Sequence, residues 1–141
     1  MRAAPTSTGG PTAGQNERDG ARLILAGAIL GFLAIGFGAF GAHGLEGKVS
    51  EQAMGWWKTA ATYHLPMALA AAVMGAFTQR GFPGARVAGW LFTAGTVVFS
   101  GSLYLLTLTD LRWLGAVTPL GGLTLMAGWA VLSLGALKTK V

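Results

Sequence analysis

Two histidines are the most versatile side chains in this chain of 141 residues. His43 lies in the segment GAFGAHGL, residues 38–45, and His64 follows an aromatic stretch, while the chain holds no cysteine. With Glu46 or Asp110, the two imidazoles would offer the nitrogen and oxygen ligands that zinc and similar ions take. No His-x3-His pair on one predicted helix supports such a site, and haem ligation would need both rings to face one cavity. We therefore expect no metal and no cofactor.

The sequence contains no recognisable arrangement of catalytic residues. No serine is accompanied by a base and an orienting acid in a recognisable arrangement, no two acids fall inside one apolar segment, and no glycine-rich phosphate loop follows a predicted strand. We therefore expect that the protein is not an enzyme. The polar residues must be understood from the elements that hold them.

Those elements are predicted to be membrane-spanning helices. Hydrophobic residues make up 52% of the chain, charged residues 11%, and the mean hydropathy is +0.55, whereas a soluble domain carries roughly 25% charged residues. Four windows, 23–45, 59–79, 87–109 and 113–137, lack Asp, Glu, Lys and Arg. A helix of about 20 apolar residues crosses a bilayer. Because strict apolar alternation is absent, we predict an all-α integral membrane four-helix bundle rather than a barrel, with spans at about 23–43, 59–79, 87–108 and 113–137.

The distribution of charge predicts the orientation of this bundle. Four spans place both termini and the link between the second and third spans on one side, and that side holds seven of the ten basic residues. By the positive-inside rule, both termini are expected in the cytoplasm or its topological equivalent. The formal net charge of +5 lies on the same side, which favours an anionic lipid surface over nucleic acid as a partner.

The predicted topology gathers polar residues in the outer half of the membrane. This candidate outer-face cluster comprises His43, Glu46, Tyr63, His64, Ser100, Ser102, Tyr104, Arg112 and Thr118. In a purely structural interpretation, the hydroxyls bond within or between helices, contributing about 0.6–2 kcal/mol each, and a histidine caps a helix end. In a binding interpretation, the aromatic residues wall a lipid or quinone pocket, with His43 and Arg112 as polar contacts; these residues are Trp56, Trp57, Tyr63, Tyr104 and Trp113.

Small residues recur at helical spacing and predict close packing between helices. We expect Gly27, Gly31 and Gly38 to form a packing face on the first span, and Gly121 and Gly128 to do so on the fourth. In lipid, small residues let helix backbones approach closely, because packing rather than hydrophobicity drives association. A compact bundle is the expected result.

The segments outside the spans have distinct compositions. Residues 1–21 are rich in Gly, Pro, Ala and Thr and predict a disordered-type cytoplasmic tail ahead of a transmembrane domain at 22–138. Between the first two spans, Ser50 and Glu51 are typical of a helix start. The pair Trp56–Trp57 is typical of the membrane interface. We predict a short interfacial helix here that runs into the second span and bends near Pro66.

Four segments carry a family resemblance: GAFGAHGL at 38–45, GWWKTAATYH at 55–64, FSGSLYLL at 99–106 and TPLGGLTLMAGW at 118–129. From about Arg22 to Leu137, the chain resembles the small four-helix membrane proteins of unknown function of the YgdD and YwdK type. The resemblance implies a fold but no activity. Relatives often carry a histidine where this chain has Pro66 or Met67, so a two-histidine site of the family would depend on His64 here.

We therefore predict a small structural or accessory subunit that contacts membrane lipids and packs against other membrane proteins or further copies of itself. The alternative is a lipid- or quinone-binding protein with a site at the outer face. A channel or transporter ranks third, because conduction paths are lined by charged side chains, backbone carbonyls or water, and the spans offer no candidate beyond His64.

Overall fold

The computed structural model of this protein describes residue 10 and residues 12–139, which form four long helices and one short π-helical turn. The elements are α1 (Ala13–Phe40), the π turn η1 (Gly41–Leu45), α2 (Glu51–Gln79), α3 (Ala85–Thr109) and α4 (Leu114–Lys138). All four helices are long and apolar enough to cross a membrane. The prediction of an all-α protein with four membrane-spanning helices is confirmed.

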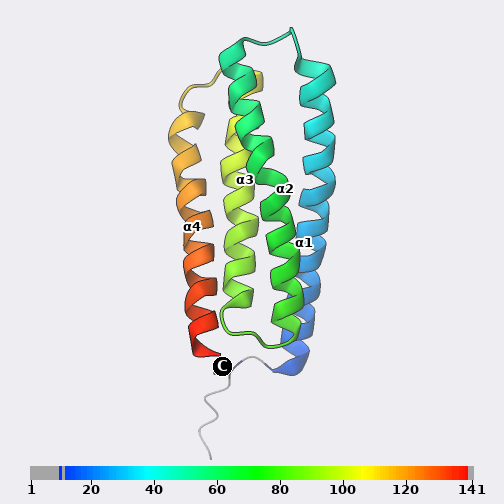
Figure 1. Cartoon of the computed structure of the whole chain (residues 1–141), viewed down its shortest axis with the longest axis vertical. Helices are drawn as coiled ribbons and strands as arrows, with labels where there is room; N and C mark the ends of the chain where they lie inside the picture. The colour runs from blue at the N-terminus through cyan, green and yellow to red at the C-terminus, as the bar shows by residue number, and fades with distance from the viewer. Residues whose placement is uncertain (1–9, 11, 140–141) are drawn as a thin grey trace, which may run out of the picture.

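The helices run alternately up and down, so α1 begins and α4 ends at the same end of the molecule (Figure 1). We call this the terminal end; it also holds the link between α2 and α3. The opposite end, which we call the distal end, holds η1 and the links before α2 and α4. The distal end is the one predicted to face outward.

Helix α1 begins well before the first apolar window. Thr12 and Gln15 form a capping box, in which the Gln15 amide lies 3.4 Å from Thr12 Oγ1 and the Thr12 amide 2.9 Å from Gln15 Oε1. Asp19 then pairs with Arg86 of α3 at 3.0 Å. The structure thus differs from the expectation of a tail over 1–21, because the cap and the ion pair order residues 13–21 as helix. Residues 1–9 and 11 of that expected tail lie outside the described residues.

The predicted interfacial helix is not a separate element. Helix α2 is continuous from Glu51 through Pro66 to Gln79, and Ser50 caps it by accepting a hydrogen bond of 3.2 Å from the Ala53 amide. The predicted start at Ser50 and Glu51 therefore holds, but the segment that follows forms the first turns of the second span. A proline lacks only one donor, so a long helix with packed neighbours can continue past it.

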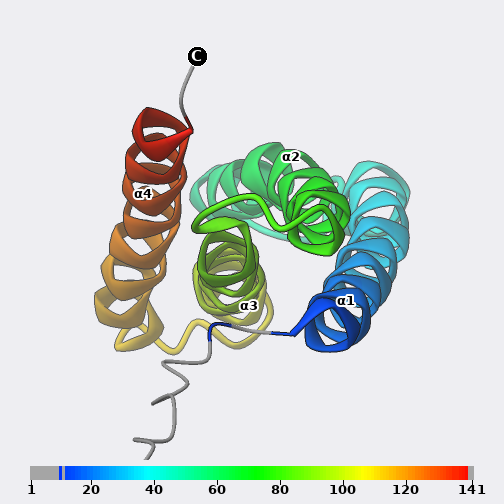
Figure 2. The same cartoon turned by 90° about the horizontal axis from the view of Figure 1, so that it is seen from below.

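The four helices do not surround a common axis. Helix α2 packs between α1 and α3, whereas α4 lies to one side (Figure 2). Among the described residues, α4 brings its Cα atoms within 8 Å of α3 but of neither α1 nor α2. The expected compact bundle is therefore a three-helix unit with a fourth helix attached through α3.

Glycines mark the closest approaches between these helices. A Cβ atom on Gly27 would lie 2.7 Å from the Ala68 carbonyl oxygen of α2, and one on Gly128 would lie 2.7 Å from the Phe92 ring of α3. Gly121 likewise faces the backbone of Phe99, with a distance of 2.7 Å to its Cα. These three positions therefore have no room for a side chain.

The structure differs from the predicted packing face at Gly31 and Gly38, where a Cβ atom would have no neighbour within 4 Å. The buried face of α1 instead passes through Gly20, Leu23, Gly27, Leu30 and Ala34. Residues that face lipid are as apolar as residues that face another helix. The spacing of small residues therefore does not distinguish the packed face from its border, where these two glycines lie.

Candidate functional site

The π turn at the end of α1 shapes the distal end of the protein. A Cβ atom on Gly41 would lie 2.5 Å from Cδ1 of Trp57, so only glycine leaves room for the indole ring. Leu45, at the other end of the turn, is buried against Trp57 and α3, while His43 between them is exposed. Single π turns inside helices often occur at functional sites. Here the turn brings the chain after α1 close to the first turns of α2.

Trp57 is the centre of an aromatic cluster formed with Phe37, Phe40, His64 and Tyr104. Its side chain is 2% exposed, its ring centroid lies 4.4 Å from that of Tyr104, and its Nε1 donates a 2.9 Å hydrogen bond to the Phe37 carbonyl. Trp57 was expected at the membrane interface beside Trp56. The helical register of Ala53, Ala60 and His64, the other buried residues of this part of α2, would have indicated its burial.

His64 is buried within this cluster. Its side chain is 3% exposed, and its Nδ1 lies 3.2 Å from the Tyr104 hydroxyl, which ties α2 to α3. The second ring nitrogen, Nε2, is buried without a hydrogen-bond partner among the described residues. The His64–Tyr104 contact thus joins α2 to α3. The Nε2 atom of His64 is left in an apolar environment.

Hydroxyl groups form further hydrogen bonds between helices toward the distal end. Ser100 donates to the Ala60 carbonyl of α2 at 2.9 Å. The Thr107 hydroxyl is shared between the Ala53 carbonyl of α2 at 3.1 Å and the Leu103 carbonyl of its own helix at 2.9 Å. Ser102 lies 2.8 Å from the Thr118 hydroxyl and joins α3 to α4. Each hydroxyl has a protein partner, which is what a structural role requires.

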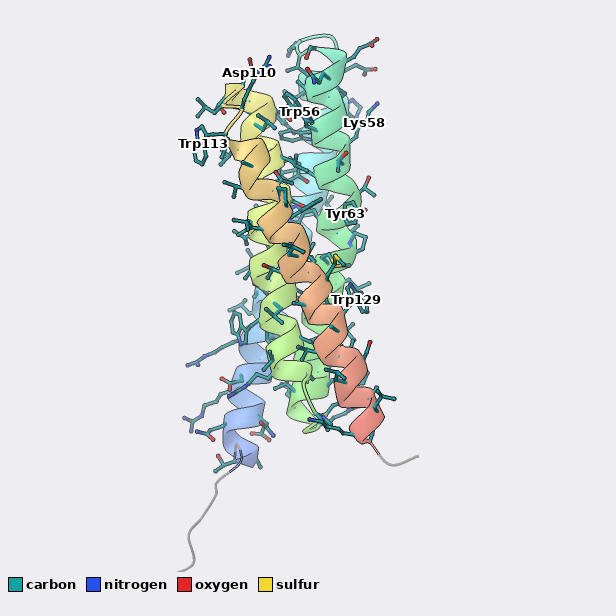
Figure 3. All side chains as sticks on the ribbon, turned by 90° about the vertical axis from the view of Figure 1, so that its left-hand side faces the viewer. Trp56, Lys58, Tyr63, Asp110, Trp113 and Trp129 are labelled. Atoms are coloured by element: carbon teal, nitrogen blue, oxygen red, sulfur yellow. The ribbon has the colours of Figure 1, made fainter. Side chains whose placement is uncertain are left out.

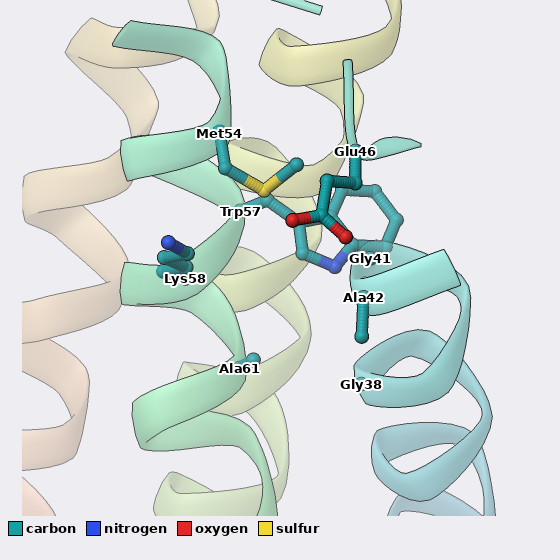
Figure 4. Close-up of a pocket in the computed structure, with 8 residues that line it drawn as sticks. All are labelled: Gly38, Gly41, Ala42, Glu46, Met54, Trp57, Lys58 and Ala61. Carbon is teal, nitrogen blue, oxygen red and sulfur yellow. The ribbon is translucent and has the colours of Figure 1, made fainter. Parts of the chain in front are cut away.

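A pocket of about 310 Å³ opens between η1 and α2, on the surface of the aromatic cluster (Figure 4). Gly38, Gly41, Ala42 and Glu46 line it from one side, and Met54, Trp57, Lys58 and Ala61 from the other. Figure 4 shows the Glu46 carboxylate in front of the Trp57 indole, with Lys58 on the α2 side. We call this the α1–α2 pocket; it combines an apolar floor with two opposite charges.

The structure divides the predicted outer-face cluster into separate parts. His64 meets Tyr104, and Ser102 meets Thr118, but Glu46 lines the α1–α2 pocket. His43 and Arg112 are exposed.

The remaining aromatic members of the predicted pocket are also separated. Tyr63 packs edge-on against Phe99 with ring centroids 5.1 Å apart, on the side that faces α4. Trp56 and Trp113 lie at the distal end, and Tyr63 lies lower (Figure 3). They therefore do not wall one common pocket. The predictions missed two residues that line the α1–α2 pocket, Met54 and Lys58. A methionine or a lysine beside a tryptophan pair does not by itself indicate a pocket.

A metal site would need several ligating side chains within reach of one ion. Across residue 10 and residues 12–139, no three histidine, cysteine, aspartate or glutamate side chains are grouped closely enough to hold an ion.

Comparison with known proteins places this arrangement in a family. A family model described as "Protein of unknown function (DUF423)" matches residues 37–122, which include η1, the aromatic cluster and the α1–α2 pocket. A UPF0382 membrane protein of Staphylococcus epidermidis is 47% identical over 115 residues, covering 82% of this chain and 94% of the relative. The UPF0382 membrane protein YwdK of Bacillus subtilis is 44% identical over 117 residues, covering 82% of this chain and 95% of the relative. No solved structure matches significantly. The chain therefore belongs to the DUF423 family of UPF0382 membrane proteins, a family of unknown function.

Proposed function

We propose that the protein binds one membrane lipid in the α1–α2 pocket and performs no chemical reaction on it. The observation that carries the proposal is the pocket itself: an opening of about 310 Å³ with an apolar floor and both a carboxylate and an ammonium group on its walls. Small-molecule sites are typically concave, mostly apolar and supplied with a few polar groups, with volumes of about 300–1,000 Å³. The volume suits the polar end of a lipid rather than the whole molecule.

The position of the pocket along the helices supports a lipid as the ligand. Glu46 is the first charged residue after the apolar window 23–45, and Lys58 is the last one before the window 59–79. Both charges therefore lie where the hydrocarbon region ends and the headgroup region begins. A molecule that enters from the bilayer meets the aromatic floor with its apolar part and the two charges with its polar part.

A quinone fits this pocket less well than a lipid. The polar atoms of a quinone ring are carbonyl oxygens, which accept hydrogen bonds from an ammonium group but find no donor on a carboxylate. Glu46 would then be left beside a ligand that repels it. We therefore favour a lipid, whose headgroup can carry groups of both signs.

Binding is tested by filling the pocket. Ala61 lines it and Ala116 lies exposed on α4 outside it, so Ala61→Phe is the test variant and Ala116→Phe the matched control. The wild-type protein and both variants are extracted in mild detergent and examined by native mass spectrometry. We expect one lipid retained by the wild type and by Ala116→Phe, and loss of that lipid in Ala61→Phe. Equal retention in both variants would show that the lipid binds elsewhere.

The proposal includes an orientation, with both termini in the cytoplasm of a bacterial cell and the pocket at the outer face. It rests on the sequence, in which a four-span topology assigns seven basic residues to the side of the termini and three to the other side. Because the chain has no cysteine, Lys48→Cys and Arg80→Cys introduce single labelling sites at opposite ends. An impermeant maleimide added to intact cells should label the first variant alone. Labelling of Arg80→Cys alone would reverse the orientation.

An accessory role is a second candidate, and the position of α4 favours it. Among the described residues, α3 is the one helix whose Cα atoms come within 8 Å of α4, and α4 borders an open apolar groove of about 260 Å³ toward α2. Gly122 lines this groove, while Gly115 on the same helix does not. If another membrane protein occupies the groove, Gly122→Leu should release it during native purification and Gly115→Leu should not. A wild-type protein that purifies without any second chain would contradict this role.

A further inference from the structure

From the charges of the α1–α2 pocket, we infer that its lipid carries a phosphoethanolamine headgroup, with the ammonium group at Glu46 and the phosphate at Lys58. The inference rests on the proposed function, because it names the class of lipid for the same pocket. The inference adds that the pocket distinguishes this headgroup from the other lipid headgroups of the same bilayer, even when the acyl chains are identical.

The two charges of the pocket are not used by the protein itself. The ion pairs among the described residues join Asp19 to Arg22 and Arg86 at the terminal end, and Glu46 and Lys58 form none, either with each other or with a third residue. The Lys58 ammonium nitrogen and the Glu46 carboxylate oxygens are therefore more than 4.0 Å apart. Two opposite charges on facing walls of one pocket, held farther apart than a direct pair, complement a ligand that carries both signs.

Among common headgroups, phosphoethanolamine matches this arrangement most closely. Its phosphate accepts hydrogen bonds from the lysine ammonium, and its own ammonium donates up to three hydrogen bonds to the carboxylate. A phosphoglycerol headgroup satisfies Lys58 through its phosphate but offers Glu46 only neutral hydroxyl donors and no positive charge. A phosphocholine headgroup has both signs, yet its quaternary nitrogen has no N–H to donate. The carboxylate is thus the residue that distinguishes between the headgroups.

The surface below the pocket has room for the lipid's acyl chain. Gly38 lines the pocket, and Gly31 lies seven residues earlier, which places it two turns away on the same side of α1. A Cβ atom at either glycine would meet no atom within 4 Å. The two glycines therefore lower the surface of α1 beside the pocket, where side chains at both positions would raise it.

The experiment presents the purified full-length protein with an equimolar mixture of phosphatidylethanolamine, phosphatidylcholine and phosphatidylglycerol of identical acyl chains. Native mass spectrometry then measures which lipid each protein retains. We expect the wild type to prefer phosphatidylethanolamine about tenfold, which corresponds to roughly one charge-assisted hydrogen bond. Glu46→Gln should lose this preference while still retaining lipid, and Lys58→Gln should retain less of all three lipids.

Two exposed charges outside the pocket provide matched controls. Glu51→Gln and Lys48→Gln make the same chemical changes near the same end of the protein, and both should behave as the wild type. Thermal unfolding of each variant establishes that it is folded. Equal retention of the three lipids by the wild type, or a preference that survives Glu46→Gln, would overturn the headgroup assignment and leave the proposed lipid site standing. A wild type that retains no lipid would refute the proposed function as well.

Discussion

Gly121 and Gly122 are neighbours on α4, but only one of them is pressed against α3. A Cβ atom on Gly121 would lie 2.7 Å from the Phe99 Cα and closer still to its amide nitrogen, so backbone atoms would have to move. A Cβ atom on Gly122 would lie 3.6 Å from the Phe99 ring, which is an ordinary van der Waals contact. Alanine at each position therefore adds one methyl group to the same helix in two different environments.

The expected effect on the free energy of unfolding follows from two contributions. Replacing glycine by alanine inside a helix stabilises it by about 0.5–1 kcal/mol, and this gain is the same at both positions. Forcing a methyl group into a packed contact costs about 1–3 kcal/mol, and this cost applies to Gly121 alone. We expect Gly122→Ala to be as stable as the wild type or slightly more stable. Gly121→Ala should be less stable than Gly122→Ala by about 1–3 kcal/mol.

Unfolding in mixed micelles with increasing dodecyl sulfate, followed by circular dichroism and by tryptophan fluorescence, measures this difference. The comparison between the two variants removes the contribution of helix propensity, which a comparison with the wild type would include. A difference below about 0.5 kcal/mol, within the usual range for surface substitutions, would refute the close approach of α4 to the Phe99 backbone. The position of α4 beside α3 would then have to be revised.

The same unfolding assay tests three further predictions, two on pairs of variants and one on a single variant. Gly27→Ala should destabilise the protein by about 1–3 kcal/mol because the backbone of α2 lies against it, while Gly31→Ala should be neutral or stabilising by up to about 1 kcal/mol because it faces open space; equal values would refute this assignment. Ser100→Ala removes a buried hydrogen bond between helices and should cost about 0.5–1.5 kcal/mol, whereas Ser133→Ala removes an exposed bond within one helix and should cost almost nothing; the reverse order would contradict the structure. Tyr104→Phe leaves the buried histidine without a hydrogen-bond partner and should cost about 1–3 kcal/mol, so an unchanged stability would show that this bond contributes nothing.

The start of α2 at the distal end was predicted correctly from a short stretch of sequence. Ser50 and Glu51 begin α2 as expected, because a cap depends on a few adjacent residues. The polar residues His64, Ser100 and Tyr104 were expected in one cluster, but they form separate hydrogen bonds between α2 and α3. Whether two polar residues in the same part of the bundle touch depends on the rotation of each helix about its axis, which hydropathy does not specify.

The α1–α2 pocket could not be predicted from the sequence, because it too depends on how the helices pack. It depends on the π turn that follows Phe40 and on the burial of Trp57, and both result from contacts between residues far apart in sequence. The sequence analysis placed Trp57 at the interface, since a tryptophan pair at the start of a span is typical of that location. Only the packing of α1 against α2 shows that one indole is buried and that Lys58 beside it reaches a pocket.

By itself, the sequence determined the class of the protein, the number and position of its spans and the relative direction of each. These properties are local, because a helix in lipid satisfies its own backbone and needs only about 20 apolar residues. Only the tertiary structure decided which glycines are packed, that α3 is the one helix within 8 Å of α4 between Cα atoms of the described residues, and where the pocket opens. The physical reason is that residues facing lipid and residues facing another helix are equally apolar, so the contrast that reveals a buried face in a soluble helix is absent here.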